Sequence, residues 1–185
     1  MRRRSSGSAG IDGVGRGCPA ERFAAALNEQ VGREFAAADQ YVSIGTHYED
    51  QDVPRLAKFF YAQADEERGH AMKMVQYMLA TNCPVELGTV AAPKNHFRGH
   101  IDPIKLALEQ EREVTVHISE LFEIARETKD YQSEQFVEWF LEEQVEEEST
   151  MEDLLAIAER TREIPMLRRN TLPANMPATD PSRTM

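Results

Sequence analysis

The chain has 185 residues, 41% of them hydrophobic, which suits one domain with a substantial core. Its net charge of −11 is unevenly spread, because residues 1–19 carry +3 and residues 164–185 carry +2, whereas the stretch between them carries −16. This acidic body favours cations as partners and argues against a nucleic-acid groove in the folded part. No run approaches about 18 consecutive apolar residues, so we expect no membrane span and a cytoplasmic protein.

The two cysteines, Cys18 and Cys83, form no Cys-x-x-Cys pair. The sequence therefore suggests neither a thiolate zinc site nor a disulfide framework. Residues 1–18 are rich in Gly, Ser and Arg with few apolar groups, and we expect them to form a mobile basic extension. No apolar run follows the first arginines, so a secretory signal peptide is not predicted.

Four long helices are predicted within residues 19–163. The first runs from Pro19 to about Tyr48, since proline is favoured in the first turn of a helix. The second begins at Pro54, with Asp52 as the expected capping residue, and runs to about Ala80.

Asp102 and Pro103 repeat this signal and open a third helix that runs to about Thr128. Ser133 is the expected cap of the fourth helix, which runs to about Arg162. Residues 164–185 contain Pro165 and then three prolines spaced four apart, at positions 173, 177 and 181, so this tail has room for only a short fifth helix.

The lengths of the connections predict the topology. The short first and third connections make each pair of helices an antiparallel hairpin. A helix of about 28 residues is roughly 42 Å long, and an extended chain crosses that length in on the order of 13 residues. Residues 81–101 are therefore long enough to run the whole bundle and leave the second and third helices parallel. The predicted fold is an all-α four-helix bundle made of two hairpins joined by a long crossover.

Polar residues interrupt the apolar stripe of each predicted helix. The same pattern occurs twice: an acid is followed 33 positions later by two polar residues three apart, as Glu34 with Glu67 and His70, and as Glu111 with Gln144 and Glu147. Residues three apart lie on one side of a helix, so each pair can direct two ligand atoms to one point. A buried carboxylate costs several kcal/mol, on the order of 3–5, unless it is paired or coordinates a metal. The basic residues next to these positions, Arg33, Arg68 and Arg112, point elsewhere, so a bound cation is the simpler counter-charge.

These residues resemble the ferritin family over roughly residues 20–162, and its non-haem bacterial branch more than the haem-binding bacterioferritins. The stretches that carry the resemblance are 28–34 with Tyr41 seven residues on, 66–71, and 142–147. A bacterioferritin or a rubrerythrin would show a second Glu-x-x-His where this chain has Gln144-Val145-Glu146-Glu147. Hard carboxylate oxygens with one imidazole suit iron.

The resemblance implies which residues hold iron. The first iron is expected on Glu34, Glu67 and His70, with Glu67 bridging to the second iron. Glu111 and Glu147 are expected to hold the second iron, with Gln144 close by. A third iron position is expected nearer the cavity, on Glu66, Glu143 and Glu146. Tyr41 resembles the tyrosine beside the first iron, and Trp139 resembles a neighbouring electron donor, although plain packing explains both aromatic residues equally well.

The resemblance also implies a function. We expect an iron-storage ferritin with ferroxidase activity, in which O₂ or hydrogen peroxide oxidises Fe²⁺ and Fe³⁺ passes to a mineral in a hollow homo-oligomer of 24 subunits. One alternative is a diiron peroxidase or oxidase of the rubrerythrin type, against which the missing second histidine and Cys-x-x-Cys module argue. Another is a DNA-binding mini-ferritin of the Dps type, which only Arg2-Arg3-Arg4 supports.

Overall fold

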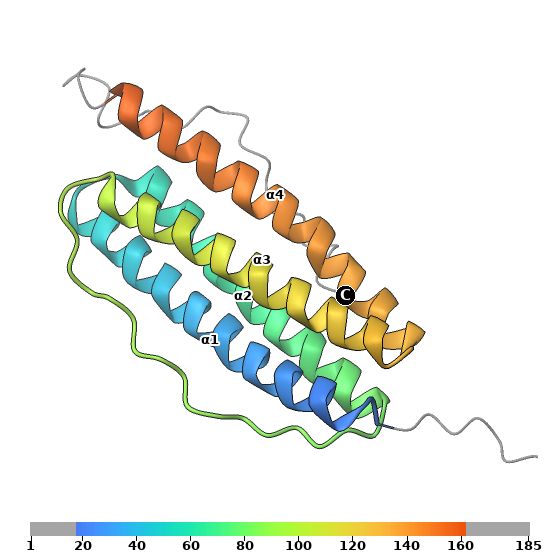
Figure 1. The fold of residues 1–185 in the computed structure, drawn as a ribbon. Helices are drawn as coiled ribbons and strands as arrows, with labels where there is room; N and C mark the ends of the chain where they lie inside the picture. The colour runs from blue at the N-terminus through green and yellow to red at the C-terminus, as the bar shows by residue number, and fades with distance from the viewer. Residues whose placement is uncertain (1–17, 162–185) are drawn as a thin grey trace, which may run out of the picture.

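The computed structural model describes residues 18–161 and contains four helices, with no strand in this range (Figure 1). They are α1 (Glu21–Asp50), α2 (Pro54–Ala80), α3 (Asp102–Glu127) and α4 (Tyr131–Thr161). The expected all-α bundle is confirmed. The helices begin and end within two residues of their predicted positions, except that α4 begins at Tyr131, three residues before the helix expected after a Ser133 cap. The predicted tail with its short fifth helix, and all but the last residue of the predicted extension, lie outside the described residues.

Two antiparallel hairpins and one crossover make up the bundle, as predicted. The crossover of residues 81–101 runs along the outside of α1 for the length of the bundle, so α2 and α3 run parallel (Figure 1). Side chains of α1 hold this long segment in place. The Gln40 amide accepts from Lys94 N–H at 2.8 Å and donates to Lys94 O at 3.0 Å, and Ser43 Oγ donates to the same oxygen. Within the described residues, no helix combines the length and apolar character needed to cross a membrane.

The apolar core consists of two clusters, one toward each end of the bundle. The first gathers buried side chains that include Phe23, Leu27, Met74, Ile118 and Phe140. The second gathers others that include Tyr48, Phe60, Ile104, Met151 and Leu154. Full burial of a side chain of this size stabilises the fold by about 1.5–3 kcal/mol. Between the two clusters, at the middle of the bundle, lie the polar residues that interrupt the stripes.

The predicted capping residues of α2 and α3 are wrong. Val53, which has no side-chain acceptor, directly precedes α2, and Asp52 lies one residue further back with a left-handed backbone, at φ of 56°. Asp102 already lies in the first turn of α3. Its Oδ2 accepts from Arg98 N–H at 3.1 Å and from Lys94 Nζ at 3.4 Å, so it fastens the end of the crossover.

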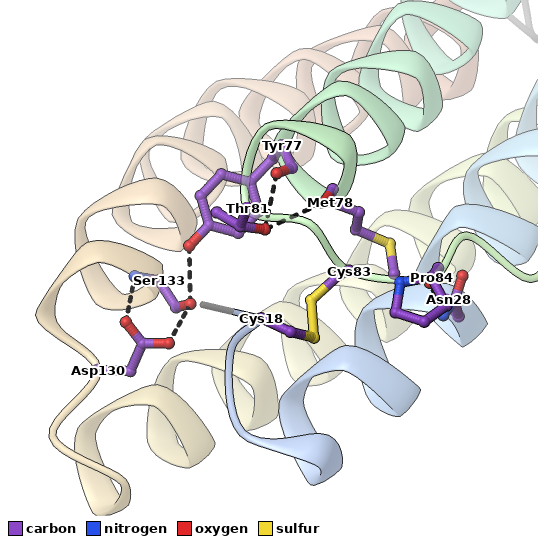
Figure 2. Close-up of a disulfide and its surroundings, with 9 residues drawn as sticks. All are labelled: Cys18, Asn28, Tyr77, Met78, Thr81, Cys83, Pro84, Asp130 and Ser133. Carbon is purple, nitrogen blue, oxygen red and sulfur yellow. Dashed lines mark hydrogen bonds between the residues drawn. A yellow bond between two sulfur atoms is a disulfide. The ribbon is translucent and has the colours of Figure 1, made fainter. Parts of the chain in front are cut away.

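The capping residue of α4 lies three positions earlier in the chain than expected. Asp130 Oδ1 accepts from the Ser133 N–H at 3.1 Å, and Asp130 Oδ2 accepts from the Ser133 hydroxyl at 2.7 Å (Figure 2). Asp130 is therefore the capping residue, and Ser133, which is fully buried, is its partner inside the first turn.

Cys18 and Cys83 form a disulfide (Figure 2), so the expectation of no disulfide is wrong. The two cysteines are 65 positions apart in sequence. They meet because an antiparallel hairpin returns the chain to its starting end, so the residues before α1 lie beside the residues after α2. The bond joins Cys18, just before α1, to the first part of the crossover.

Candidate metal centre

All four helices direct acids to the middle of the bundle. Carboxylate oxygens and one imidazole lie within 4.8 Å of one another in three overlapping groups, which are Glu34 with Glu67 and His70, Glu67 with Glu111 and Glu147, and Glu66 with His70 and Glu147. Except for Glu66, which is half-buried, these side chains are at most 6% exposed. The structure thus brings together the acids and the histidine predicted for the two iron positions. Such a cluster can hold divalent cations.

Helix geometry places the two residues of α2. Glu67 and His70 are three apart and lie on the same side of the helix, where His70 Nδ1 is 3.5 Å from Glu67 Oε2. Glu67 belongs to the group formed with α1 and also to the group formed with α3 and α4. Among the carboxylates, Glu67 and Glu147 each belong to two groups, and Glu67 is the one that links the α1 group to the group of α3 and α4.

Glu34 is oriented by a residue that sequence reasoning missed. Gln30, fully buried one helical turn earlier, donates its amide N–H to Glu34 Oε1 at 2.8 Å and accepts from Arg33 Nη1 at 3.2 Å. The sequence did contain a signal for this role, because Gln30 lies four residues before Glu34 and so on the same face of the helix. The other oxygen, Glu34 Oε2, is buried with no hydrogen-bond partner among residues 18–161. A buried acceptor without a partner is costly, and a cation would satisfy it.

Glu111 is held by two residues that were both predicted to belong to the site. The Tyr41 hydroxyl donates to Glu111 Oε1. The Gln144 amide nitrogen donates to Glu111 Oε2 and to the Glu111 carbonyl, each at 3.2 Å. Because the nitrogen of Gln144 faces Glu111, its carbonyl oxygen is the atom able to bind a cation.

The residues expected for a third iron are brought together only in part. Glu66 joins a group with His70 and Glu147, and it accepts from the Gln63 amide at 2.9 Å. Glu143 is buried and Glu146 is exposed, and neither enters a group of three ligands within the described range. The third position therefore stays a prediction.

The Trp139 side chain packs against His70 at one side of the cluster. The Trp139 ring meets the His70 ring edge-on, with 5.6 Å between the ring centroids. The Lys73 ammonium lies 3.1 Å from the centroid of the indole, which is a cation–π contact. Sequence reasoning picked out Trp139 but missed Lys73, although Lys73 follows His70 by three residues on the same helix.

Residues 24–161 match the family of the Ferritin-like domain. The chain belongs to the ferritin family. It is similar to Ferritin BfrB of Mycolicibacterium smegmatis, with 46% identity over 139 residues that cover 75% of this chain and 77% of that one. It is also similar to Ferritin BfrB of Mycobacterium tuberculosis, at 44% identity over 77% of this chain and 78% of the relative.

Two further comparisons agree with this membership. A bacterial non-heme ferritin of Staphylococcus epidermidis is 41% identical over 128 residues, covering 69% of this chain and 77% of the relative. A solved structure, described as a novel open pore ferritin from the archaeon Archaeoglobus fulgidus, superposes with a TM-score of 0.78 at 28% identity, covering 80% of this chain and 91% of that one.

Burial controls the protonation of this ferritin's acids. Removal from water raises the pKa of Glu67 and of Glu147 well above the ordinary value, and the nearby Glu111 carboxylate raises both further. Burial also raises the pKa of Glu111 to about 7, although hydrogen bonds from Tyr41 and Gln144 lower it. Without a cation the cluster therefore keeps protons at neutral pH, and a cation that binds there must displace them.

Burial also sets the protonation of the two other groups in the cluster. It raises the pKa of the Tyr41 hydroxyl well above its usual range, and the carboxylates of Glu111 and Glu67 raise it further, so Tyr41 stays a neutral donor. Burial lowers the pKa of His70 below its ordinary value. A neutral imidazole is the form that binds metal ions.

Proposed function

We propose that this chain is an iron-storage ferritin with ferroxidase activity, which oxidises Fe²⁺ at a diiron site inside each subunit and deposits Fe³⁺ as mineral in a hollow shell. The observation that carries the proposal is the buried cluster of carboxylates and one imidazole, to which all four helices contribute. Oxygen-rich donor sets with one nitrogen suit iron better than soft metals. Glu34 Oε2, which has no hydrogen-bond partner among residues 18–161, supports a cation as its partner.

The grouping of ligand atoms suggests how two ions share the cluster. Glu34, Glu67 and His70 would hold the first Fe²⁺, and Glu111 with Glu147 would hold the second. Glu67 would bridge them, since it lies within reach of both groups. Gln144 and Tyr41 would position Glu111, because both donate hydrogen bonds to its carboxylate.

The chemistry is a two-electron oxidation. Each of two Fe²⁺ ions gives up one electron, and the two electrons with two protons reduce O₂ to hydrogen peroxide or hydrogen peroxide to two waters. The protons held by Glu67, Glu111 and Glu147 in the empty cluster leave when iron binds. Fe³⁺ then moves toward the cavity, for which Glu66, Glu143 and Glu146 would offer a third iron position.

Storage requires a cavity, so we propose a homo-oligomer of 24 subunits, located in the cytoplasm, of the non-haem bacterial type. The bundle proper would cover residues 19–163, with a basic extension before it and a tail after it. Ferritin-named relatives do not favour the two alternatives, a rubrerythrin-type enzyme and a Dps-type DNA-binding protein. The Gln144–Glu147 pair stands where a bacterioferritin would have a second Glu-x-x-His, and this supports the non-haem bacterial branch.

The test is aerobic loading with Fe²⁺. Stopped-flow absorbance at two Fe²⁺ per subunit should show a fast oxidation phase. Analytical ultracentrifugation after further loading should show a particle of about 24 subunits that holds far more iron than its binding sites do. A dimer as the largest species at micromolar concentration, with iron retained only at stoichiometric amounts, would contradict storage and favour a diiron enzyme.

A further inference from the structure

The disulfide at the open end of the first hairpin joins an exposed cysteine to a buried one. Cys18 is exposed, whereas Cys83 is 5% exposed and packs within the core cluster that contains Phe23 and Met78. Thiol–disulfide exchange begins when a thiolate attacks one sulphur, and the choice of sulphur depends on access. Cys18 is therefore the more accessible side of the bond, and attack at its Sγ would release Cys83 as the leaving thiolate.

The crossover side of the bond is held in place by other contacts. The Cys83 N–H donates to Met78 O at 2.8 Å, which ends α2. The Asn28 side chain donates to Pro84 O at 3.2 Å and accepts from Glu86 N–H at 2.8 Å, which fixes the next residues to α1 (Figure 2). None of these bonds needs the disulfide, so Cys83 keeps its place when the bond opens.

The α1 side of the bond has less support. Ala20 precedes the helix and has no side-chain oxygen to cap it, so its carbonyl accepts from Phe23 N–H and Ala24 N–H while the first donors stay uncapped. Cys18 lies only two residues earlier. The disulfide thus restrains the start of α1 where a capping side chain would otherwise do so.

We propose that Cys18–Cys83 is a reversible thiol–disulfide site that a dithiol reductant opens and its oxidised form closes. The reductant's thiolate attacks Cys18 Sγ, the bond to Cys83 breaks, and the Cys83 thiolate takes up a proton. The second thiol of the reductant then displaces Cys18 and forms the reductant's own disulfide. Two electrons and two protons pass from the dithiol to the protein, which gains two thiols.

The physiological meaning of the site rests on the proposed function. Disulfides in cytoplasmic proteins are usually transient or redox-sensing rather than structural. Iron loading uses O₂ or peroxide and iron release needs electrons, so this site would be closed under the conditions of loading and open under those of release. Opening it frees the start of α1 and leaves the end of α2 fixed.

The experiment uses the iron-free, assembled full-length chain. It is equilibrated, without denaturant, with mixtures of reduced and oxidised dithiothreitol, quenched in acid, alkylated and weighed by mass spectrometry. We expect the mass to shift by two alkyl groups, along the same titration curve from either direction, while the oligomer stays assembled. A disulfide that opens only after denaturant is added, or two free thiols at every ratio, would overturn the proposal.

Hydrogen exchange tests the local consequence. Reduction should speed exchange at the Phe23 and Ala24 amides at least threefold and leave Cys83 N–H unchanged, and Cys18→Ser should exchange like the reduced wild type without any reductant. Equal exchange in both states would refute the restraint on α1. Because iron is absent throughout, a failure here leaves the ferroxidase proposal standing, and loss of ferroxidase activity would not alter the thiol titration.

Discussion

Replacing Glu111 by glutamine should stabilise the iron-free protein at alkaline pH and not at acidic pH. Glu111 is 2% exposed, and burial raises its pKa from 4.5 to about 7. The folded state therefore binds the proton more tightly than the unfolded state, so the stabilising effect of protonation is present below pH 4.5 and is lost as the pH rises through 7. Between pH 5 and pH 8 the free energy of unfolding of the wild type should fall by on the order of 2 to 3 kcal/mol through this group.

Glutamine stays neutral throughout and so removes this dependence. Its amide nitrogen must face either Tyr41 or Gln144, which both donate to Glu111, and the mismatch costs about 1 kcal/mol at either pH. The difference between the two pH values is therefore the informative quantity. Relative to the wild type, the free energy of unfolding of Glu111→Gln should rise by on the order of 2 to 3 kcal/mol on going from pH 5 to pH 8.

The assay is urea unfolding of chelator-treated protein at both pH values and at equal subunit concentration, since assembly contributes to apparent stability. Glu113→Gln is the matched control, because it removes the same charge from an exposed position on the same helix. If Glu111→Gln changes the free energy of unfolding equally at pH 5 and pH 8, the reasoning about a buried, proton-holding carboxyl is refuted.

Three further predictions concern iron and assembly. Glu67→Ala combined with His70→Ala should abolish the fast phase of Fe²⁺ oxidation in stopped flow and leave a soluble oligomer. Arg68→Ala, at an exposed position between them, should keep the fast phase. An unchanged fast phase in the double variant would contradict the site. Glu143→Ala should leave the first oxidation fast and change the number of Fe²⁺ oxidised per O₂, and iron-soaked crystals of the wild type with no anomalous peak near this residue would remove the third position. If residues 164–185 build a channel of the shell, their deletion should lower its melting temperature or its iron retention; unchanged values for both would make them a dispensable extension.

Much of the fold and of the candidate site could be predicted because helical periodicity and ligand spacing are local properties. Glu34, Glu67 and Glu111 each interrupt an apolar stripe, and the structure buries each of them at the middle of the bundle. The length of residues 81–101 was enough to predict the parallel arrangement of α2 and α3.

What the sequence did not yield depends on contacts between distant segments. The pairing of Cys18 with Cys83 requires knowing that the start of α1 meets the end of α2, and the predicted hairpin already contained that signal. Asp102 reads as a helix cap from its neighbours, but the crossover offers it Arg98 N–H, a partner that only the folded loop provides. The bond from Tyr41 to Glu111 likewise joins α1 to α3.

Trp139 is the only tryptophan in the chain, and its ring lies against His70 with the Lys73 ammonium over its face. Indole emission responds to nearby charges and is quenched by iron at close range. Excited at a wavelength that tryptophan absorbs and tyrosine does not, the unlabelled protein therefore emits from one side chain, whose ring centroid is 5.6 Å from that of His70. Light emitted there would dim as the cluster fills and recover as it empties, so the residence time of iron at the site can be followed separately from the growth of the mineral.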